Sequence, residues 1–475
     1  MSKIEVNTVD VQCGSTLTLG SSGKTVQLAT GASQSGFGRT GTVDWQTGSI
    51  KTSTFTAANG EGYFCNTSGG AFTVNLPSSP SAGSIVSVKD YSGTFDTNNL
   101  TVGRGGSNIE GQASDKVLSG ESQAVTFIYV DSTKGWLITN DMNTSQVPSF
   151  VAATGGNSTA TCGDYKIHTF TGPGTLCVSS AGNVAGNNKI EYLVVAGGGG
   201  GGGPQGGGGG GAGGLRFAST SIAPLTYPAK PLAGTEITAS ATAYPITVGG
   251  GGAKGSAGSG GGGCCSQEGT SGNNSSFSII TSAGGGGGGV GQAPRGSEAQ
   301  GKNGGSGGGG GGRAGGGGSE NPATGAPGGT GNTPPVTPAQ GTDGGKSRTT
   351  GSPPNDDRGG GGGGAIAAGS NAGASTDPAG AGGAGGGFPT AFGSNGQPCG
   401  SFRYYAGGGG GGLDGPPGCA GAGGLGGGAA GIKDSTPGSN ATDNTGGGGG
   451  GAGTSHPLSG TNGGSGIVVI RYKFQ

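Results

Sequence analysis

The chain has 475 residues and a formal net charge of −1, and 128 of its residues are glycine. Charged residues make up 10% of the chain, whereas an average soluble protein carries about 25% charged residues and about 7% glycine. The near-neutral charge and the absence of a lysine or arginine cluster argue against nucleic acid as a partner. No apolar run is long enough to span a bilayer and no secretory signal is visible, so we expect no membrane insertion and synthesis in the cytoplasm.

Residues 1–45 are the first predicted region. Apolar and polar residues alternate within 4–11, 16–19 and 25–28, with Gly and Ser between these pieces. A period of two is typical of half-buried strands, but each piece is too short to bury a core by itself. We therefore expect this N-terminal β segment to serve attachment and oligomerisation, with identical partners completing it in a homotrimer.

Residues 46–142 are predicted to form one small antiparallel β domain. Phe72, Val74 and Leu76 alternate toward one face, and two apolar strands bracket a hairpin connection at 131–135. Residues 143–190 add a few strands, including 165–170, and are assigned to a β linker domain. No capped stretch with a period of 3.6 residues occurs. The predicted fold is therefore all-β, with essentially no α-helix.

The remaining region, 191–475, is about one-third glycine without the strict triplet period of collagen. A run of six residues in the extended threefold polyproline-II geometry spans about 19 Å and makes no internal hydrogen bonds. Its N–H and C=O groups need neighbouring chains, and only Gly fits where every face is packed. The sequence predicts a polyglycine-II helix sandwich. Runs of at least six consecutive glycines occur at 197–203, 206–211, 284–289, 307–312, 359–364, 407–412 and 446–451.

A flexible glycine linker is the alternative reading of this region. Ordering a backbone costs about 1–2 kcal/mol per residue, so only an extensive lattice of hydrogen bonds can offset it. Three features favour order: the runs share a length, they contain little Ser, and two apolar strands at 190–196 and 466–472 bracket the region. These strands look suited to pair and so to bring the ends of the region together.

The bracketing strands also carry a family resemblance. The opening IEYLVVAGGGGGGG and the closing GGSGIVVIRY resemble the glycine-rich domain of phage tail fibres and adhesins, over about 188–475. In the fibre-tip adhesins of T-even-like phages such a domain holds receptor-binding loops at its distal end. The N-terminal MSKIEVNTVDVQCGS is similar to tail-fibre-like virion proteins of marine phages. This chain departs from the T-even adhesins because it has its own fibre-like N-terminal half, so the resemblance does not imply docking onto a separate fibre.

Alternating run directions would place the loops after every second run at the distal end. Counting the visible runs puts 319–358 and 388–406 there, and 413–419 at the proximal end. Aromatic and Arg side chains dominate binding hot spots and rings stack on sugars, although the same rings can instead pack on one another. For Asp356, Asp357 and Arg358 the alternatives to receptor contact are a solvated loop and a cation site. The predicted receptor-binding residues are Phe388, Phe392, Phe402, Arg403, Tyr404, Tyr405, Asp356, Asp357 and Arg358.

Residues for enzyme chemistry are scarce. The chain has two His, His168 and His456, and neither has a nucleophile and a carboxylate at recognisable spacing. Glycine-rich motif matches carry little weight where every third residue is Gly. Cys162 and Cys177 flank a hairpin-like stretch where they could meet, and no cysteine spacing indicates zinc. We expect no enzyme, no catalytic residues, no cofactor and no metal site.

The combined reading is a receptor-binding protein of a virion tail. Its expected partners are a host cell-surface receptor, either a polysaccharide or an outer-membrane protein, and other virion tail proteins. One alternative is a non-adhesive structural or decoration protein of the capsid or tail. A second is an ice- or surface-binding protein, which would need a flat, regular Thr/Ala face.

Overall fold

The computed structural model is all-β and divides into two compact units between Gln146 and Val147. Within the described residues its helical elements are the short 3-10 turns η2 (Gly296–Ala299) and η3 (Thr390–Phe392), and none is long and apolar enough to cross a membrane. The fold-class prediction is confirmed. The description covers residues 43–142, 149–184, 186–222, 233–256, 266–293, 296–314, 325–348, 357–374, 377–415, 418–433, 437–453 and 459–475.

The first unit is a pair of sheets packed face to face. The first sheet has the order β1 (Asp44–Trp45), β3 (Glu61–Cys65), β5 (Ile85–Asp90), β8 (Ala124–Asp131) and β9 (Gly135–Met142). The second sheet has the order β2 (Phe55–Thr56), β4 (Phe72–Asn75), β6 (Leu100–Gly103) and β7 (Lys116–Leu118).

The strand directions in this unit differ from the predicted antiparallel arrangement. Pairs β1–β3–β5 and β2–β4–β6 are parallel, and the antiparallel pairs are those made by β7, β8 and β9. The chain crosses from one sheet to the other after each early strand, so neighbours within a sheet run the same way. The inward positions were predicted well: Phe72, Val74 and Leu76 are at most 9% exposed and lie in one core cluster. β1 also belongs to this unit, inside the region expected to end at residue 45.

The second unit has a base made of two sheets. The larger sheet has the order β11 (Ser158–Cys162), β12 (Tyr165–Phe170), β27 (Ile467–Lys473), β14 (Lys189–Val195) and β15 (Leu215–Ala218), with β16 (Ile237–Thr238) also pairing with β14. The smaller sheet has the order β10 (Val151–Thr154), β13 (Gly174–Ala181), β17 (Ala243–Thr247), β18 (Ser275–Phe277) and β19 (Ile280–Ser282).

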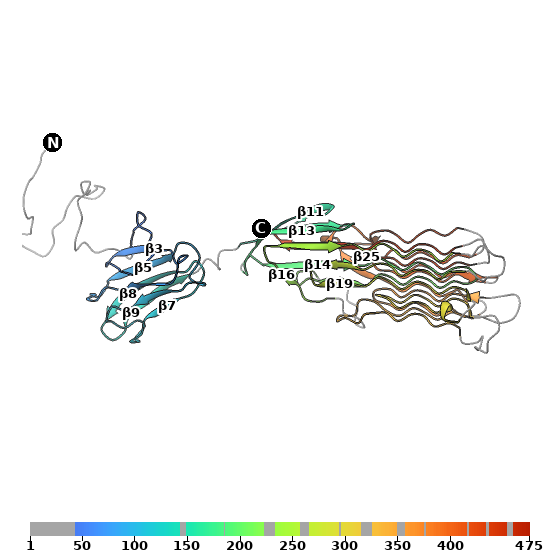
Figure 1. Cartoon of the computed structure of the whole chain (residues 1–475), viewed down its shortest axis with the longest axis horizontal. Helices are drawn as coiled ribbons and strands as arrows, with labels where there is room; N and C mark the ends of the chain where they lie inside the picture. The colour runs from blue at the N-terminus through green and yellow to red at the C-terminus, as the bar shows by residue number, and fades with distance from the viewer. Residues whose placement is uncertain are drawn as a thin grey trace, which may run out of the picture. The chain divides into compact units, whose positions relative to one another are not determined.

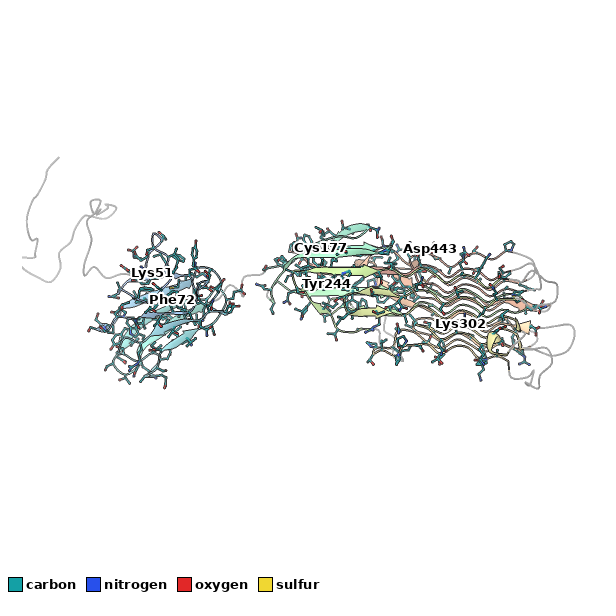
Figure 2. The ribbon with its side chains drawn as sticks, viewed as in Figure 1. Lys51, Phe72, Cys177, Tyr244, Lys302 and Asp443 are labelled. Atoms are coloured by element: carbon teal, nitrogen blue, oxygen red, sulfur yellow. The ribbon has the colours of Figure 1, made fainter. Side chains whose placement is uncertain are left out.

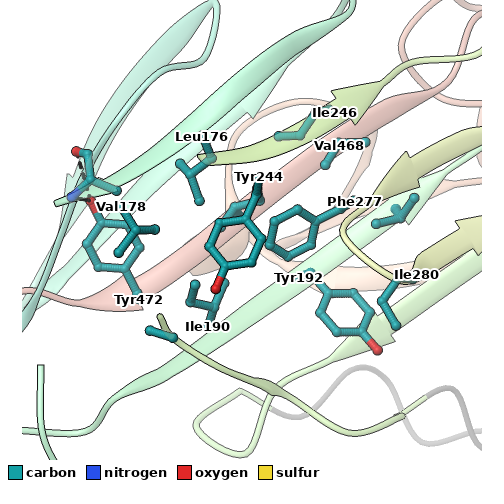
Figure 3. Close-up of a cluster of buried hydrophobic side chains, with 14 of the residues drawn as sticks. Leu176, Val178, Ile190, Tyr192, Tyr244, Ile246, Phe277, Ile280, Val468 and Tyr472 are labelled. Atoms are coloured by element: carbon teal, nitrogen blue, oxygen red, sulfur yellow. Dashed lines mark hydrogen bonds between the residues drawn. The ribbon is translucent and has the colours of Figure 1, made fainter. Parts of the chain in front are cut away.

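The ends of the glycine-rich region meet in the base, as the sequence predicted. β14 and β27 pair antiparallel from Ile190–Tyr472 to Val195–Ile467. β27 also pairs with β12, so residues expected to form a separate linker domain at 143–190 are part of this unit. Figure 3 shows the apolar cluster between the two sheets, where Tyr192, Tyr244 and Phe277 lie together.

Extended glycine-rich segments run away from the base side by side (Figure 1) and form a bundle. Their hydrogen bonds repeat every three residues, the period of the polyproline-II helix. In segment 206–214, Gly207 and Gly210 donate to 446–453, Gly208 and Gly211 donate to 283–290, and Gly209 and Ala212 donate to 357–364. The same segment accepts hydrogen bonds from 196–203, 306–312 and 406–413.

The bundle is therefore concentric, with 206–214 at its centre and the six segments just named around it. Every residue of these central and inner segments is buried. They contain all the long glycine runs of the sequence, which confirms that uninterrupted glycine marks the positions packed on all sides. A Cβ added to Gly198, Gly362 or Gly410 would lie 2.0 Å from a carbonyl oxygen of a neighbouring segment.

An outer ring of segments surrounds this core, and in it glycine is diluted by other residues. In 249–256 the buried positions Gly249, Gly252 and Gly255 alternate with exposed ones at the same period of three. Side chains such as that of Lys302 project from the outer ring, as Figure 2 shows. The outer segments are 249–256, 266–274, 300–305, 325–331, 341–348, 367–374, 378–385, 418–424, 428–433, 437–443 and 459–465.

One corner of the outer ring has no segment among the described residues. It lies beside inner segment 283–290, between the outer segments 266–274 and 300–305. At this position side chains replace the backbone of a neighbouring segment. The Asn274 Oδ1 accepts a hydrogen bond from the N–H of Gly284 at 2.9 Å, and Lys302 forms an ion pair with Glu268. We call this position the open corner.

Candidate functional site

The bundle has a proximal end on the base and a distal end away from it. The segments reverse direction at both ends, so the distal end consists of the links between them. Its described parts include Pro204–Gln205, η2, β20 (Gln292–Ala293), β21 (Arg313–Ala314), β22 (Asp357–Arg358) and β26 (Leu413–Asp414). Residues 257–265, 315–324 and 349–356 lie outside the described residues.

Short backbone pairings tie the distal end together. β22 pairs antiparallel with β26, β20 pairs parallel with β21, and Arg348 forms an isolated antiparallel bridge with Arg358. Val290, Ala299 and Ala326 add a small buried apolar cluster. The central turn is also fixed, since the N–H of Gly206 donates to Gly453 and its carbonyl accepts from Gly312. The distal ends of the bundle segments are therefore held in place by backbone hydrogen bonds to neighbouring segments.

Two predicted contact residues are buried at the distal end. Asp357 is 3% and Arg358 is 0% exposed, and a Cβ on Gly418 would lie 3.3 Å from the Arg358 guanidinium. Side chains this buried offer no surface to a receptor, so the prediction is corrected for both: they brace the distal end. Asp356 lies outside the described residues.

The predicted aromatic site lies at the proximal end. Phe388, Phe392 and Tyr405 are at most 2% exposed and pack in one cluster with strands of the base. The ring centroids of Phe388 and Phe392 lie 4.8 Å and 5.3 Å from that of Phe217 on β15. The Tyr405 hydroxyl donates to the Asn395 carbonyl at 2.6 Å, and burial raises the pKa of this phenol. The alternative reading, that these rings pack on one another and on their surroundings, holds for these three residues.

The other aromatic candidates share this location. Phe402, Arg403 and Tyr404 are half-buried on β25 (Phe402–Tyr405), which lies between β23 (Gly386–Pro389) and β24 (Gln397–Cys399) in a sheet beside the base. Burial also raises the pKa of Tyr404. The predicted distal position of 388–406 is therefore wrong.

The error has a physical origin in the outer ring. Outer segments such as 300–305, 325–331 and 341–348 cross the whole bundle, yet they lack long glycine runs because part of their surface faces solvent. Each crossing left out of the count reverses the assignment of the following loops. The same miscount misplaced 413–419, which contains the distal strand β26.

The exposed groups that the structure brings to the distal end were not singled out by sequence. Arg348, Asp377 and Cys419 are exposed there, at the ends of outer segments. The sequence carried only a weak signal for these three residues: each lies within three residues of a Pro, Ser or Thr that interrupts the glycine pattern.

His168, Cys162 and Cys177 are side chains of reactive types, and they lie in the base. His168 is 1% exposed, with Nδ1 2.7 Å from the Gly155 carbonyl and Nε2 3.0 Å from the Tyr472 hydroxyl, and burial lowers its pKa. Cys162 and Cys177 are free and exposed, so the pairing considered from sequence does not form. Over the described residues no group of three His, Cys, Asp or Glu is placed to hold a metal ion.

Comparison with known proteins gives one family match. A family model described as a glycine-rich domain matches residues 171–473. The match begins inside the base, before β13, and ends on the last residue of β27, so it covers the closing strand pair and the whole bundle. No curated protein matches the chain.

Proposed function

The chain belongs to the glycine-rich domain family, and from that premise we propose that it is a phage tail-fibre protein that binds the host cell surface through the distal end of its bundle. The observation that carries this proposal is the division of the second unit into a packed base and a remote end. Apolar and aromatic side chains gather at the base, while the distal end carries polar links between fixed segments.

The bundle is suited to present such links. Its central and inner segments extend for seven to nine residues, which in the polyproline-II geometry is about 22–28 Å. A lattice bonded in several directions cannot bend without breaking backbone hydrogen bonds. Links whose two ends are fixed lose less conformational freedom on binding than free loops, and this saving favours affinity.

The partners follow from the same proposal. The receptor is a polysaccharide or an outer-membrane protein of the host cell, met at the distal end. The N-terminal region attaches the protein to other tail proteins of the virion, and the chain acts as a homotrimer. The resemblance of both ends of the sequence to phage fibre proteins supports this assignment.

Native cysteines allow a direct test. Cys419 is exposed at the distal end, and Cys177 is exposed on the outer surface of the base. Two variants, each keeping one of these thiols together with the buried Cys65 and carrying Ser at the other six cysteines of the chain, are coupled to a bulky maleimide polymer. Binding of the purified protein to host cells is then measured. We expect loss of binding with the polymer on Cys419 and retained binding with it on Cys177. Equal binding by both conjugates contradicts the distal site.

The alternative function is a non-adhesive structural or decoration protein. One observation favours it: on one side of the bundle the outer segments 378–385 and 418–424 consist only of Ala, Gly, Pro and Cys. Such a surface offers little for recognition. In this case the unlabelled protein does not bind host cells at all, while particles that lack it are unstable.

A further inference from the structure

At the open corner, inner segment 283–290 keeps a backbone donor that the bundle does not satisfy. The N–H groups of Gly284 and Gly287 face the corner, because the other glycine N–H groups of this segment donate to two neighbouring inner segments. Asn274 accepts from Gly284, whereas the buried Gly287 N–H has no acceptor among the described residues. Buried backbone N–H groups are almost always paired, so an acceptor is missing at this point.

One row of side chains on segment 266–274 explains why only one of these donors is satisfied. Glu268, Ser271 and Asn274 follow one another at the period of three and therefore lie on the same side of the segment. Asn274 reaches the inner segment across the corner, and Glu268 reaches the opposite outer segment. Ser271 stands between them, one period from Asn274 and thus level with Gly287, and its short side chain does not supply the missing acceptor.

Another corner of the outer ring shows what fits such a position. Inner segment 357–364 is the counterpart of 283–290, since the central segment donates hydrogen bonds to both. Its two outward N–H groups, those of Gly361 and Gly364, donate to carbonyl groups of the outer segment 367–374. That segment in turn donates to the outer segments on its two sides. A single extended chain therefore satisfies all the neighbours of a corner.

The open corner also offers acceptors for the N–H groups of such a chain. A Cβ on Gly287 would lie 1.9 Å from the Gly269 carbonyl oxygen, and a Cβ on Gly284 would lie 1.8 Å from the Gly272 carbonyl oxygen. These two oxygens therefore lie beside the residues that carry the outward N–H groups. Within the described residues neither oxygen accepts a hydrogen bond. Donors and acceptors at the corner thus match the backbone of one added segment.

We propose that the open corner binds one extended segment of another protein, held in the polyproline-II conformation with Gly or Ala at every third position. The small residues face the bundle, where the corner segment 249–256 carries Gly249, Gly252 and Gly255. A second copy of this chain is not the source, because its glycine runs of six or more residues already lie in central and inner positions. The contact lies on the side of the bundle, so it is independent of the receptor contact proposed for the distal end.

The side chains that now cover the corner must move aside when the segment binds. Asn274 then loses its hydrogen bond, but the Gly284 N–H gains a carbonyl group of the bound segment in exchange. The side chains of Lys302 and Glu268 are 33% and 32% exposed, so solvent screens their attraction and separating them costs little. A segment that adopts the polyproline-II conformation before binding loses little conformational entropy when it fills the corner.

Fluorescence anisotropy with the full chain tests the proposal. The probe is a labelled, end-capped synthetic peptide with the sequence of 367–374, the segment that fills the equivalent corner. We expect this peptide to bind saturably. The control peptide carries Gly369→Val, which should abolish binding because a Cβ at this position lies 2.0 Å from a carbonyl oxygen in the occupied corner.

Three variants of the chain locate the binding at the open corner. Ser271→Asn gives Gly287 the kind of side-chain acceptor that Gly284 already has, and it should weaken binding about ten-fold or more. Asn274→Ala removes the competing side chain and should strengthen binding. Ser370→Asn makes the same change as the first variant in the occupied corner, and it should leave binding of the peptide unchanged.

The proposal is overturned if the unchanged chain and Asn274→Ala both fail to bind the peptide, or if folded Ser271→Asn binds it as tightly as the unchanged chain. Equal binding of the control peptide also overturns it, because the contact would then not depend on the small residues. Sedimentation of the chain alone identifies a different occupant: if the unchanged chain is a dimer and Ser271→Asn is a single copy, a second copy fills the corner and a segment of another protein does not.

Discussion

The base and the bundle of the second unit are stabilised by different parts of the polypeptide. In the base, rings and branched side chains fill the space between two sheets. In the bundle interior there are almost no side chains, and backbone N–H and C=O groups of neighbouring segments satisfy one another. The base should therefore be sensitive to the loss of side-chain atoms, whereas the bundle should be sensitive to their addition.

The largest expected effect comes from one methyl group in the bundle interior. In Gly362→Ala the new Cβ would lie 2.0 Å from the Gly210 carbonyl oxygen, and surrounding segments leave no direction in which to move. Overpacking typically costs about 1–3 kcal/mol, and we expect more here because the surrounding backbone cannot move aside. Gly250→Ala is the control, since the nearest atom to its Cβ is 3.8 Å away. Urea denaturation should show strong destabilisation for the first variant alone, and equal stability of the two would break the comparison.

In the base, removing a charged partner should be the sensitive change. Arg471 and Glu191 form an ion pair whose side chains are 5% and 2% exposed, and Ser221 bonds to both. Glu191→Ala leaves a buried guanidinium without its counter-charge, which costs about 3–5 kcal/mol. The exposed pair of Lys473 and Asp164, 3.8 Å apart, provides the control, and Lys473→Ala should cost less than about 1 kcal/mol. Thermal unfolding at matched pH measures both.

The open corner sharpens the comparison, because there the bundle does depend on a side chain. Asn274→Ala removes the acceptor of the Gly284 N–H, and the expected cost is about 1–2 kcal/mol. Asn274→Asp keeps an oxygen in place and should recover much of the loss. If Asn274→Ala is as stable as the unchanged chain in urea, the side chain does not replace a missing segment.

The smallest effect is expected for the ion pair over the same corner. The side chains of Lys302 and Glu268 are 33% and 32% exposed, so solvent screens their attraction. Glu268→Ala should lower the free energy of unfolding by about 0.2–1 kcal/mol, and in 1 M salt this difference from the unchanged chain should disappear. A loss of several kcal/mol of stability that does not depend on salt would show that these side chains stabilise the open corner by more than the attraction of their charges.

The sequence specified the interior of the bundle and the closing strands well. Uninterrupted glycine is required only where a segment is packed on all sides, so the long runs identified the central and inner segments. The outer segments 300–305, 325–331 and 341–348 were missed because exposed positions accept Lys, Thr or Asn, which hides the period of three. That omission moved Phe388 and Tyr405 from the base to the distal end in the prediction.

Strand direction in the first unit was also beyond the sequence pattern. The alternation at Phe72, Val74 and Leu76 fixes which face is buried, but it is the same in parallel and antiparallel sheets. Direction depends on whether consecutive strands enter the same sheet, and the short Gly and Ser turns permit both. The buried contacts of Asp357 and Arg358 were equally invisible, because they depend on pairing with the remote residues of β26.

Amide hydrogen exchange followed by mass spectrometry tests the central claim most directly. Segment 206–214 is bonded to neighbours on all sides, so its amides should exchange only when the whole unit opens. The outer segment 249–256 should exchange faster, and a peptide of the same composition should exchange fastest. Exchange of 206–214 at the rate of the free peptide would contradict an ordered glycine lattice and identify the region as a linker.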